Sequence, residues 1–359
     1  MKKFVKIAAC FAFAVALCLT VASCKKKDKD TKVAYKLGMG VEVSLDSSKT
    51  GAAQYDATVA SVVLDSEGKI VACRLDAVQN KLTLKDGSWT ITNLKTKMEL
   101  GDDYGMAKWG QNLDMNGDGV VKEWYDQAKA FENYVVGKTG DEVANLKTQT
   151  NAEGYQMSAD DALLNAGCTI QITDFMAAVS KACKDDQAQN FELLSSAKFT
   201  LGVAATSKVN EDSTAATAEK DGSLNVYSDF AATVVSDDKI VSCINDAIQP
   251  KLAFNLAGEI TGKTFVNTKR CLKSDYNMTK WGTDANGDGV VKEWYEQSKI
   301  FSDYVVGKTG KEVEALKTSP IGENDHYQRP ADKELLNAGC TIQITEIKAV
   351  VAKAVANAR

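Results

Sequence analysis

Two short acidic motifs are candidates for binding a metal ion. Each has the form Asp-x-Asn-x-Asp-Gly, with oxygen donors at alternate positions and a glycine for the sharp turn, as in the first half of an EF-hand calcium loop. A tyrosine stands at the twelfth position, so a glutamate two residues earlier would replace the usual bidentate ligand, and a valine would contribute its backbone carbonyl. The candidate ligands are Asp114, Asn116, Asp118, Val120 and Glu123 in the first motif and Asp284, Asn286, Asp288, Val290 and Glu293 in the second. The alternative is an Asn-Gly and Asp-Gly turn that places negative charge near a helix N-terminus.

A threonine is the second candidate for chemistry, and it also occurs twice. Thr169 and Thr341 each follow a Gly-Cys pair and begin the pattern Thr-Ile-Gln-Ile-Thr. Alternation with a period of two places the cysteine and the isoleucines on one face of a short strand and the threonine on the other, polar face. We therefore expect both hydroxyls to be exposed on a strand over residues 168–173 and 340–345. They either face water only or serve as an attachment point for a ligand.

Both candidates recur because the chain is a tandem repeat. Residues 114–125 return as residues 284–295 with only Met115 changed, to Ala285, and residues 163–173 return unchanged as residues 335–345. The segment YVVGKTG at residues 134–140 recurs at residues 304–310. Matches of this length predict two homologous domains, 35–190 and 191–359, joined near residues 187–194.

Each repeat places strand patterns before helix patterns. Hairpins are expected at residues 57–75 and 231–244, where alternating apolar runs flank turn residues. A helical stripe with four-, three- and four-residue spacing follows in each repeat, formed by Trp124, Ala128, Phe131 and Val135 and by Trp294, Ser298, Phe301 and Val305. We expect Gly137 to end the first of these helices. We also expect a short helix at residues 141–147 and a final helix whose N-terminus is capped by Thr173 or Asp174. The order predicts an α+β fold in which each repeat is an antiparallel sheet with packed helices.

The N-terminus has the pattern of an exported lipoprotein. Residues 1–23 form a basic start and an apolar run that is too short for a spanning helix, which predicts a signal peptide. Val21-Ala22-Ser23-Cys24 resembles a lipobox, so Cys24 is the expected lipidation site, although an ordinary cleavage site with an incidental cysteine is the alternative. The lysine-rich residues 24–34 contain little apolar surface to fold on and are expected to form a tether. This pattern predicts a lipid-anchored protein on the extracytoplasmic face of the membrane, in contact with the lipid bilayer through Cys24.

Composition excludes several classes of function. The formal net charge of −5 argues against a nucleic acid partner. His326 is the only histidine and no Cys-x-x-Cys occurs, so zinc, haem and a histidine-based catalytic triad lack the necessary residues. Beyond Cys24 the chain has six cysteines, whose pairing the sequence leaves open.

Several segments together resemble a known family. They are the lipobox and lysine-rich tether, LGDDYGM at residues 100–106, KEWY at 122–125, VVGK at 135–138, and Thr169-Ile170 before a helix that begins Asp-Phe. The chain resembles the tandem FMN-binding-domain lipoproteins of Gram-positive extracellular electron transfer, and the resemblance covers most of both repeats. It implies two FMN-binding-like domains, each with covalent FMN that a flavin transferase esterifies onto Thr169 or Thr341. The motif glycine then corresponds to Gly167 and Gly339.

The resemblance also implies a function. Tyr104 and Tyr276 would each cover one face of an isoalloxazine ring, for which packing in the core is the alternative use. The protein would be an electron carrier rather than an enzyme in its own right, taking electrons from a membrane-bound donor and passing them to a surface or soluble acceptor. The alternative is a cofactor-free surface lipoprotein, stiffened by calcium, that binds a ligand or a partner.

Overall fold

The computed structural model describes residues 30–359 with gaps at 86–87, 92–93, 110–113, 115–116, 118, 210–211, 265–266, 281, 283, 285–286, 288 and 322–323. The predicted signal peptide, Cys24 and most of the predicted tether lie outside the described residues. The tether prediction is wrong for residues 32–34, because they belong to the first strand and pair with a strand from residues 189–194.

The first half of the chain, residues 30–194, forms a five-stranded antiparallel sheet with the order β4-β3-β2-β1-β7. Its strands are β1 (Lys32–Ser44), β2 (Ala52–Leu64), β3 (Ile70–Lys85), β4 (Ser88–Ile91) and β7 (Gln189–Leu194). The junction predicted between residues 190 and 191 falls inside β7, which pairs with β1.

The second half, residues 195–359, forms a sheet that follows the order of β1 to β4 with one interruption. Its strands are β8 (Thr200–Val209), β9 (Gly222–Ser236), β10 (Lys239–Ile248), β11 (Lys251–Phe254) and β12 (Ile260–Thr264). β9 pairs with β8 along one edge and with β10 and then β11 along the other. β10 and β11 correspond to the continuous strand β3, and they are separated at Pro250, which has no N–H to donate to a ladder.

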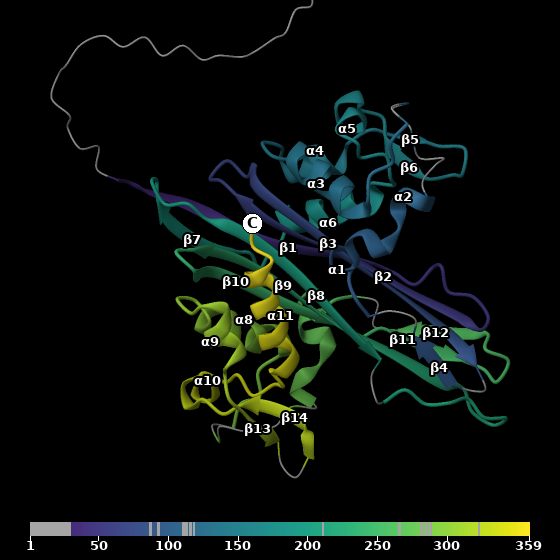
Figure 1. The fold of residues 1–359 in the computed structure, drawn as a ribbon. Helices are drawn as coiled ribbons and strands as arrows, with labels where there is room; N and C mark the ends of the chain where they lie inside the picture. Colours follow the sequence, from purple (N-terminus) through teal and green to yellow (C-terminus); the bar gives the residue numbers. More distant parts are fainter. Residues whose placement is uncertain are drawn as a thin grey trace, which may run out of the picture.

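Helices cover the outer face of each sheet (Figure 1). In the first half they are α1 (Lys97–Leu100), α2 (Met106–Trp109), α3 (Trp124–Tyr134), α4 (Gly140–Ala144), α5 (Asp161–Asn165) and α6 (Thr173–Cys183). In the second half they are α7 (Lys269–Leu272), α8 (Trp294–Tyr304), α9 (Gly310–Glu314), α10 (Lys333–Asn337) and α11 (Thr345–Ala356). The short 3-10 turn η1 (Gly101–Tyr104) follows α1, and the turns η3 (Lys273–Tyr276) and η4 (Met278–Lys280) follow α7. Each half also has a small hairpin. It is formed by β5 (Thr148–Thr150) and β6 (Gln156–Ser158) in the first half and by β13 (Thr318–Ile321) and β14 (Asn324–Pro330) in the second. None of the helices among the described residues is long and apolar enough to cross a bilayer.

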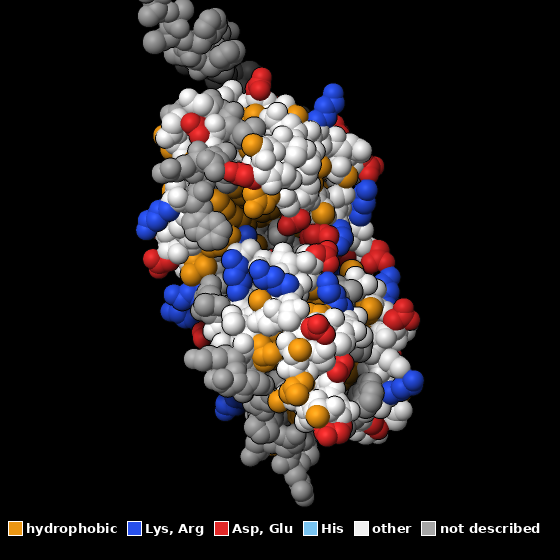
Figure 2. Space-filling model, turned by 90° about the vertical axis from the view of Figure 1, so that its right-hand side faces the viewer, with side chains coloured by type: hydrophobic (Ala, Val, Ile, Leu, Met, Phe, Trp, Pro, Cys, Tyr) orange, Lys and Arg blue, Asp and Glu red, His pale blue; other side chains and the backbone are white. Residues whose placement is uncertain are grey.

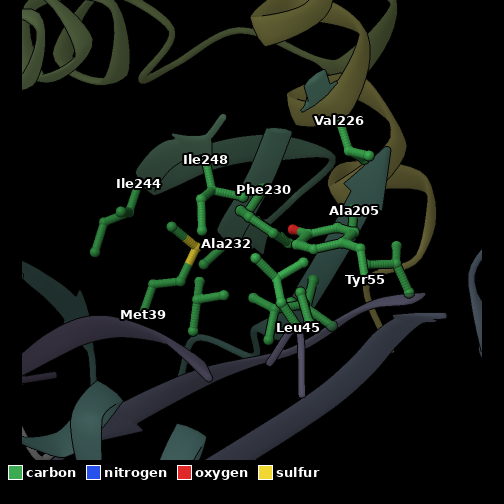
Figure 3. Packing of buried hydrophobic residues seen from close by; sticks show 14 of the residues in the cluster. Met39, Leu45, Tyr55, Ala205, Val226, Phe230, Ala232, Ile244 and Ile248 are labelled. Atoms are coloured by element: carbon green, nitrogen blue, oxygen red, sulfur yellow. The ribbon is translucent and has the colours of Figure 1, made fainter. Parts of the chain in front are cut away.

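The two sheets pack face to face and form the middle of a four-layer arrangement. Met39 and Tyr55 from the first sheet meet Phe230, Ala232 and Ile248 from the second in the central core (Figure 3). Two further cores lie between each sheet and its own helices. Strands such as β2 are therefore buried on both faces, since Val59 belongs to the central core and Val62 to the outer one.

Glycines allow the helices to lie directly on the strands. A Cβ at Gly38 of β1 would be 2.0 Å from the carbonyl oxygen of Ala182 in α6, and a Cβ at Gly202 of β8 would be 1.9 Å from that of Ala354 in α11. Any side chain at either position would push the helix away from the sheet. The first strand and the last helix of each half therefore contact each other through their backbones.

Most of the expected local elements are confirmed. The α+β class, the antiparallel sheets, both hairpins and the helices that carry Trp124 and Trp294 are present. Gly137 ends its helix segment with φ of 84°. The predicted caps are wrong, because α6 starts at Thr173 itself and its N-cap, Ile172, makes no side-chain capping bond.

On the face shown in Figure 2, apolar side chains gather in a hollow near the middle, and charged side chains of both signs are spread over the described surface around them.

Candidate functional site

Thr169 and Thr341 lie in irregular loops and not in strands. The loops connect α5 to α6 and α10 to α11. Each chain segment turns at a glycine in the left-handed region, with φ of 86° at Gly167 and 92° at Gly339. Cys168 then donates its N–H back to the carbonyl of Leu163 (3.2 Å), as in the end of a helix and unlike a sheet ladder. The strand prediction is wrong because a left-handed glycine ends α5 and the loop after it forms no ladder with a described strand, since only the Ile172 N–H bonds to β6, at the carbonyl of Gln156 (3.0 Å).

The threonine hydroxyls are buried, so the prediction that they are exposed on a polar face is also wrong. Thr169 is 1 % exposed and Thr341 is 8 % exposed. In the first half the side-chain oxygen of Gln127 accepts the Thr169 N–H at 2.8 Å and lies 3.4 Å from its hydroxyl. In the second half Gln297 makes the same contacts with Thr341 at 2.7 and 3.2 Å. The alternate residues are buried as expected, since Cys168, Ile170 and Ile172 all belong to the outer core.

A lysine lies over the glycine that precedes each threonine by two residues. A Cβ at Gly167 would be 2.6 Å from Cε of Lys122, and one at Gly339 would be 2.5 Å from Cε of Lys292. The Lys122 ammonium donates to the carbonyl of Ala166 at 2.9 Å. The space beside Gly167 and Gly339 is therefore occupied by a flexible lysine, which would have to move before a ligand or an enzyme could reach the threonine.

The predicted ring-stacking residues contact a lysine. The Lys97 ammonium lies 5.0 Å from the ring centre of Tyr104 and 5.5 Å from that of Trp124. In the second half the buried Lys269 lies 4.7 Å from Tyr276 in the same way. These are cation–π contacts on the helix side of each sheet. Tyr104 and Tyr276 are half-buried beside their outer cores.

The lysine of the second half is enclosed more fully than its counterpart. The Lys269 ammonium donates to the hydroxyl of Tyr227 at 2.6 Å and lies 5.2 Å from the ring centre of Trp294. Asp229 is 3 % exposed, and its burial raises its pKa to about 7 in spite of the attraction of Lys269. Buried charge thus accumulates under the helices of the second half.

A buried aspartate fixes the start of the first helix in each half. Asp76 accepts the N–H of Ala77 at 2.7 Å and that of Met98 in α1 at 3.3 Å, and burial raises its pKa to about 6. Asp246 accepts the equivalent N–H groups of Ala247 at 2.8 Å and Arg270 at 3.0 Å, and burial raises its pKa as well. These carboxylates position α1 and α7, and with them the lysine that follows each N-cap.

The acidic motifs form turns at the described positions. Asp114 accepts the N–H of Gly119 at 2.9 Å, and Asp284 accepts that of Gly289 at 2.8 Å. Asn116, Asp118, Asn286 and Asp288 lie outside the described residues, and the side chains of Val120 and Val290 are exposed. Among the residues with described positions, no group of three or more histidine, cysteine, aspartate or glutamate side chains is arranged to hold a metal ion. Calcium binding therefore stays a prediction.

The two glutamates of the motifs are bound to backbone amides. Glu123 accepts the N–H of Met106 at 2.8 Å and that of Ala107 at 3.2 Å. Glu293 accepts the N–H of Met278 at 2.8 Å and the hydroxyl of Thr279 at 3.2 Å. Each glutamate holds the start of the turn that follows Tyr104 or Tyr276, and it would have to leave these donors to bind a metal ion.

The six cysteines that the sequence left unassigned are free thiols in the described structure. Burial raises the pKa of Cys168 and of Cys340 to about 12. A thiol with so high a pKa is protonated at neutral pH and unreactive. These two cysteines therefore act as small apolar side chains in the outer cores.

The residues that sequence reasoning missed share one property, which is that the repeat preserves their type. They are Gln127 with Gln297, Lys122 with Lys292, Lys97 with Lys269, and Asp76 with Asp246. Gln127 and Gln297 carry the clearest signal, because each is a polar residue that recurs beside the apolar stripe of its helix. Recurrence inside one chain marks such positions even where no motif is recognisable.

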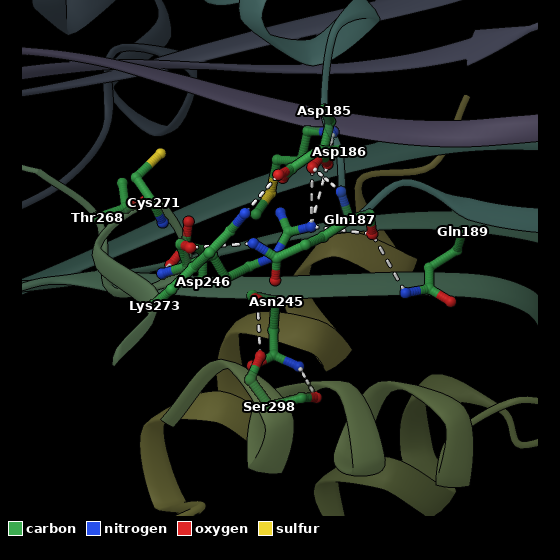
Figure 4. A network of polar contacts seen from close by, with 12 residues as sticks. Asp185, Asp186, Gln187, Gln189, Asn245, Asp246, Thr268, Cys271, Lys273 and Ser298 are labelled. Carbon is green, nitrogen blue, oxygen red and sulfur yellow. Dashed lines mark hydrogen bonds and ion pairs between the residues drawn. The ribbon is translucent and has the colours of Figure 1, made fainter. Parts of the chain in front are cut away.

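A buried ion pair connects α7 of the second half to the segment that follows α6 in the first half (Figure 4). The guanidinium of Arg270 in α7 donates to both carboxylate oxygens of Asp185 at 3.1 Å and to the carbonyl of Gln187 at 3.0 Å. The two side chains are 8 % and 7 % exposed.

Comparison of the chain with profiles of known protein families, with curated protein sequences and with solved structures found no match.

Proposed function

We propose that the protein is an extracytoplasmic electron carrier with one FMN esterified to Thr169 and a second to Thr341. On this proposal the halves are homologous FMN-binding-like domains over residues 35–190 and 191–359, and Cys24 anchors the chain to the membrane. The observation that supports it best is the duplicated surroundings of the threonine. In both halves a glutamine oxygen receives the threonine N–H, and a lysine lies over the glycine two residues before it.

This arrangement suits a phosphoester. In the transfer the threonine oxygen attacks the FMN phosphorus of a flavin dinucleotide, the bond to the nucleotide leaving group breaks, and the hydroxyl proton passes to a base of the transferase. The resulting phosphodiester keeps one negative charge. Lys122 or Lys292, whose side chain lies against the glycine two residues before the threonine, would compensate that charge. Charge-assisted hydrogen bonds to phosphate are about twice as strong as neutral ones.

The buried threonine must become accessible before it reacts. Its loop is held by the bond from Lys122 to the Ala166 carbonyl, by the Gln127 bond to Thr169, and by the bond from the Ile172 N–H to the Gln156 carbonyl. At about 1 kcal/mol net for each hydrogen bond, opening costs at least ~3 kcal/mol, which leaves the open loop populated at roughly one part in a hundred or less. Local opening of this size permits slow modification without global unfolding.

The bound flavin would supply the one- and two-electron chemistry, and the protein would supply its position and electrostatic surroundings. Tyr104 and Tyr276, with the adjacent Lys97 and Lys269, offer aromatic surface and positive charge on the helix side of each sheet. The expected partners are a flavin transferase, a membrane-bound electron donor and a surface or soluble acceptor. The protein is then a carrier and not an enzyme in its own right.

The second candidate function is a cofactor-free surface lipoprotein that binds calcium. One observation favours it: Asp114 and Asp284 already accept the N–H of the glycine five residues later, which is the sixth position of a calcium loop. The same bond forms in an ordinary turn.

Intact mass after coexpression with a flavin transferase tests the main proposal. The wild type should gain two FMN masses and stay yellow after denaturation, whereas Thr169→Ala and Thr341→Ala should each lose one. Thr169→Ser is the matched control, because it keeps the hydroxyl and should keep the flavin. A wild type that gains no flavin with a transferase from its own organism, or a double alanine variant that is still labelled, refutes the assignment.

A further inference from the structure

A cavity between the two halves has no role in the sites described so far. It has a volume of about 690 Å³ and lies between residues 186–190 of the first half and the strand β10 and helix α8 of the second. Its lining includes Ile244, Asn245, Lys292, Tyr295 and Ser298. This volume falls in the range of small-molecule sites, about 300–1,000 Å³.

The equivalent place in the first half is filled. Asn245 and Ser302 of the second half correspond to Leu75 and Glu132 of the first, by the spacing of the repeat. The Glu132 carboxylate, 1 % exposed, accepts the Leu75 N–H at 2.8 Å and is bound by Arg359 at 3.0 Å. Large paired side chains therefore occupy the first half at this place.

Smaller side chains leave the space open in the second half. Asn245 donates to the Ser302 hydroxyl at 2.7 Å, and the Ser298 hydroxyl donates to Asn245 at 2.8 Å. These three buried groups satisfy one another at the wall of the cavity. The cavity is thus a consequence of the side chains that distinguish the two halves.

Lys292 gives the cavity a positive charge that no carboxylate among the described residues pairs with. The Lys299 ammonium pairs with Asp303 at 2.6 Å, and Arg270 pairs with Asp185. Glu296 at the rim is exposed, and its carboxylate accepts the Glu293 N–H at 2.8 Å. The half-buried Lys292 ammonium, in contrast, makes no hydrogen bond or ion pair with any residue in the described part of the chain. An anionic group at this point would supply the missing partner.

Lys292 also connects the cavity to the proposed attachment point. Its side chain lies against Gly339, two residues before Thr341, while it lines the cavity. We propose that this cavity binds a planar aromatic phosphate monoester or diester of the size of FMN, in the second half only. The identification of the ligand as the flavin ring attached to Thr341 rests on the proposed function, and it places that ring beside Tyr295 of the cavity wall instead of against Tyr276, which is not among the described lining residues. The flavin on Thr169 then has no equivalent cavity and stays more exposed.

Titration of the double variant Thr169→Ala/Thr341→Ala with free FMN tests the inference. This chain cannot be esterified, so the result is independent of whether a transferase modifies the protein. We expect one FMN per chain, detected by equilibrium dialysis and by quenching of flavin fluorescence. Lys292→Gln should weaken FMN binding roughly tenfold, because a charge-assisted phosphate contact is lost.

Two controls separate the cavity from other surfaces. Lys122→Gln, the equivalent change in the first half, should leave FMN binding unchanged, and Lys292→Gln should leave the binding of riboflavin, which lacks the phosphate, unchanged. No binding at millimolar FMN, two equivalent sites per chain, or equal weakening by the two lysine changes would overturn the inference. If the wild type fails to gain covalent flavin but this titration gives one site, the proposed function fails and the cavity site stands.

Discussion

Replacing Arg270 by methionine tests how the two halves are held together. Methionine is a natural choice because Met98 occupies the equivalent position of the first half. The change removes the guanidinium from the buried Asp185 carboxylate, which keeps, among the described residues, the N–H groups of Met39 at 3.1 Å and Gln187 at 2.9 Å. Removal of one partner from a buried pair costs about 3–5 kcal/mol, because an uncompensated charge stays buried.

A matched change distinguishes the cost of leaving the buried Asp185 unpaired from the cost of losing an ion pair at the surface. Lys273→Met breaks the neighbouring ion pair with Asp186, whose side chains are 44 % and 65 % exposed, and should cost less than about 1 kcal/mol. Asp185→Ala in the Arg270→Met background removes the unpaired carboxylate and should recover part of the loss. Urea unfolding of the four chains gives the free energies, provided that the slopes agree.

The reasoning fails under two outcomes. If Arg270→Met and Lys273→Met lower the free energy of unfolding by the same amount, burial of the pair is not what gives it importance. If the double variant is no more stable than Arg270→Met, the single variant carried no penalty from an unpaired charge.

Three further predictions follow from the buried charge, the acidic motifs and the N-terminus. The pKa of Asp229 is about 7 in the folded chain and lower in the unfolded chain, so the folded chain binds this proton more tightly and the free energy of unfolding falls as the pH rises from about 4 to 7. The melting temperature of Asp229→Asn should fall less over that range than that of the wild type. An equal fall would contradict the role of burial. The exposed Asp46→Asn is its control. Millimolar calcium should raise the melting temperature, and Asp114→Asn with Asp284→Asn should reduce the rise, whereas an unchanged wild type leaves only the turn interpretation. Mass spectrometry of the mature N-terminus should find a diacylglyceryl group on Cys24, and an unmodified cysteine or cleavage elsewhere would refute the lipoprotein prediction.

Local patterns predicted much of the fold because their physical causes are local. The hairpin of β2 and β3 follows from alternation around the turn at residues 65–68, and the helix α3 follows from the spacing of Trp124, Ala128 and Phe131. The repeat itself was readable without any structure. The hairpin and the helix each depend on residues that are close to one another along the chain, and the repeat is visible by comparing one part of the sequence with another.

The threonine loop shows where local patterns fail. Alternate burial of Cys168, Ile170 and Ile172 is real, but a loop covered by helices produces the same alternation as a strand. The group that buries Thr169 is Gln127, 42 residues earlier, and no local pattern connects the two. Sequence reasoning placed Thr169 exposed on a strand, whereas it lies buried in a loop.

The sequence by itself determined the repeat, the order of strands and helices, and the residue types that recur in both halves, because these depend on neighbours in the chain. Tertiary structure decided that the two sheets pack face to face, that β7 joins the first sheet, and that a cavity forms between residues 186–190 and the strand β10 and helix α8 of the second half. The physical reason is that burial and pairing depend on side chains far apart in the sequence. Glu132 fills its half because Arg359 reaches it, whereas Ser302 leaves its half open.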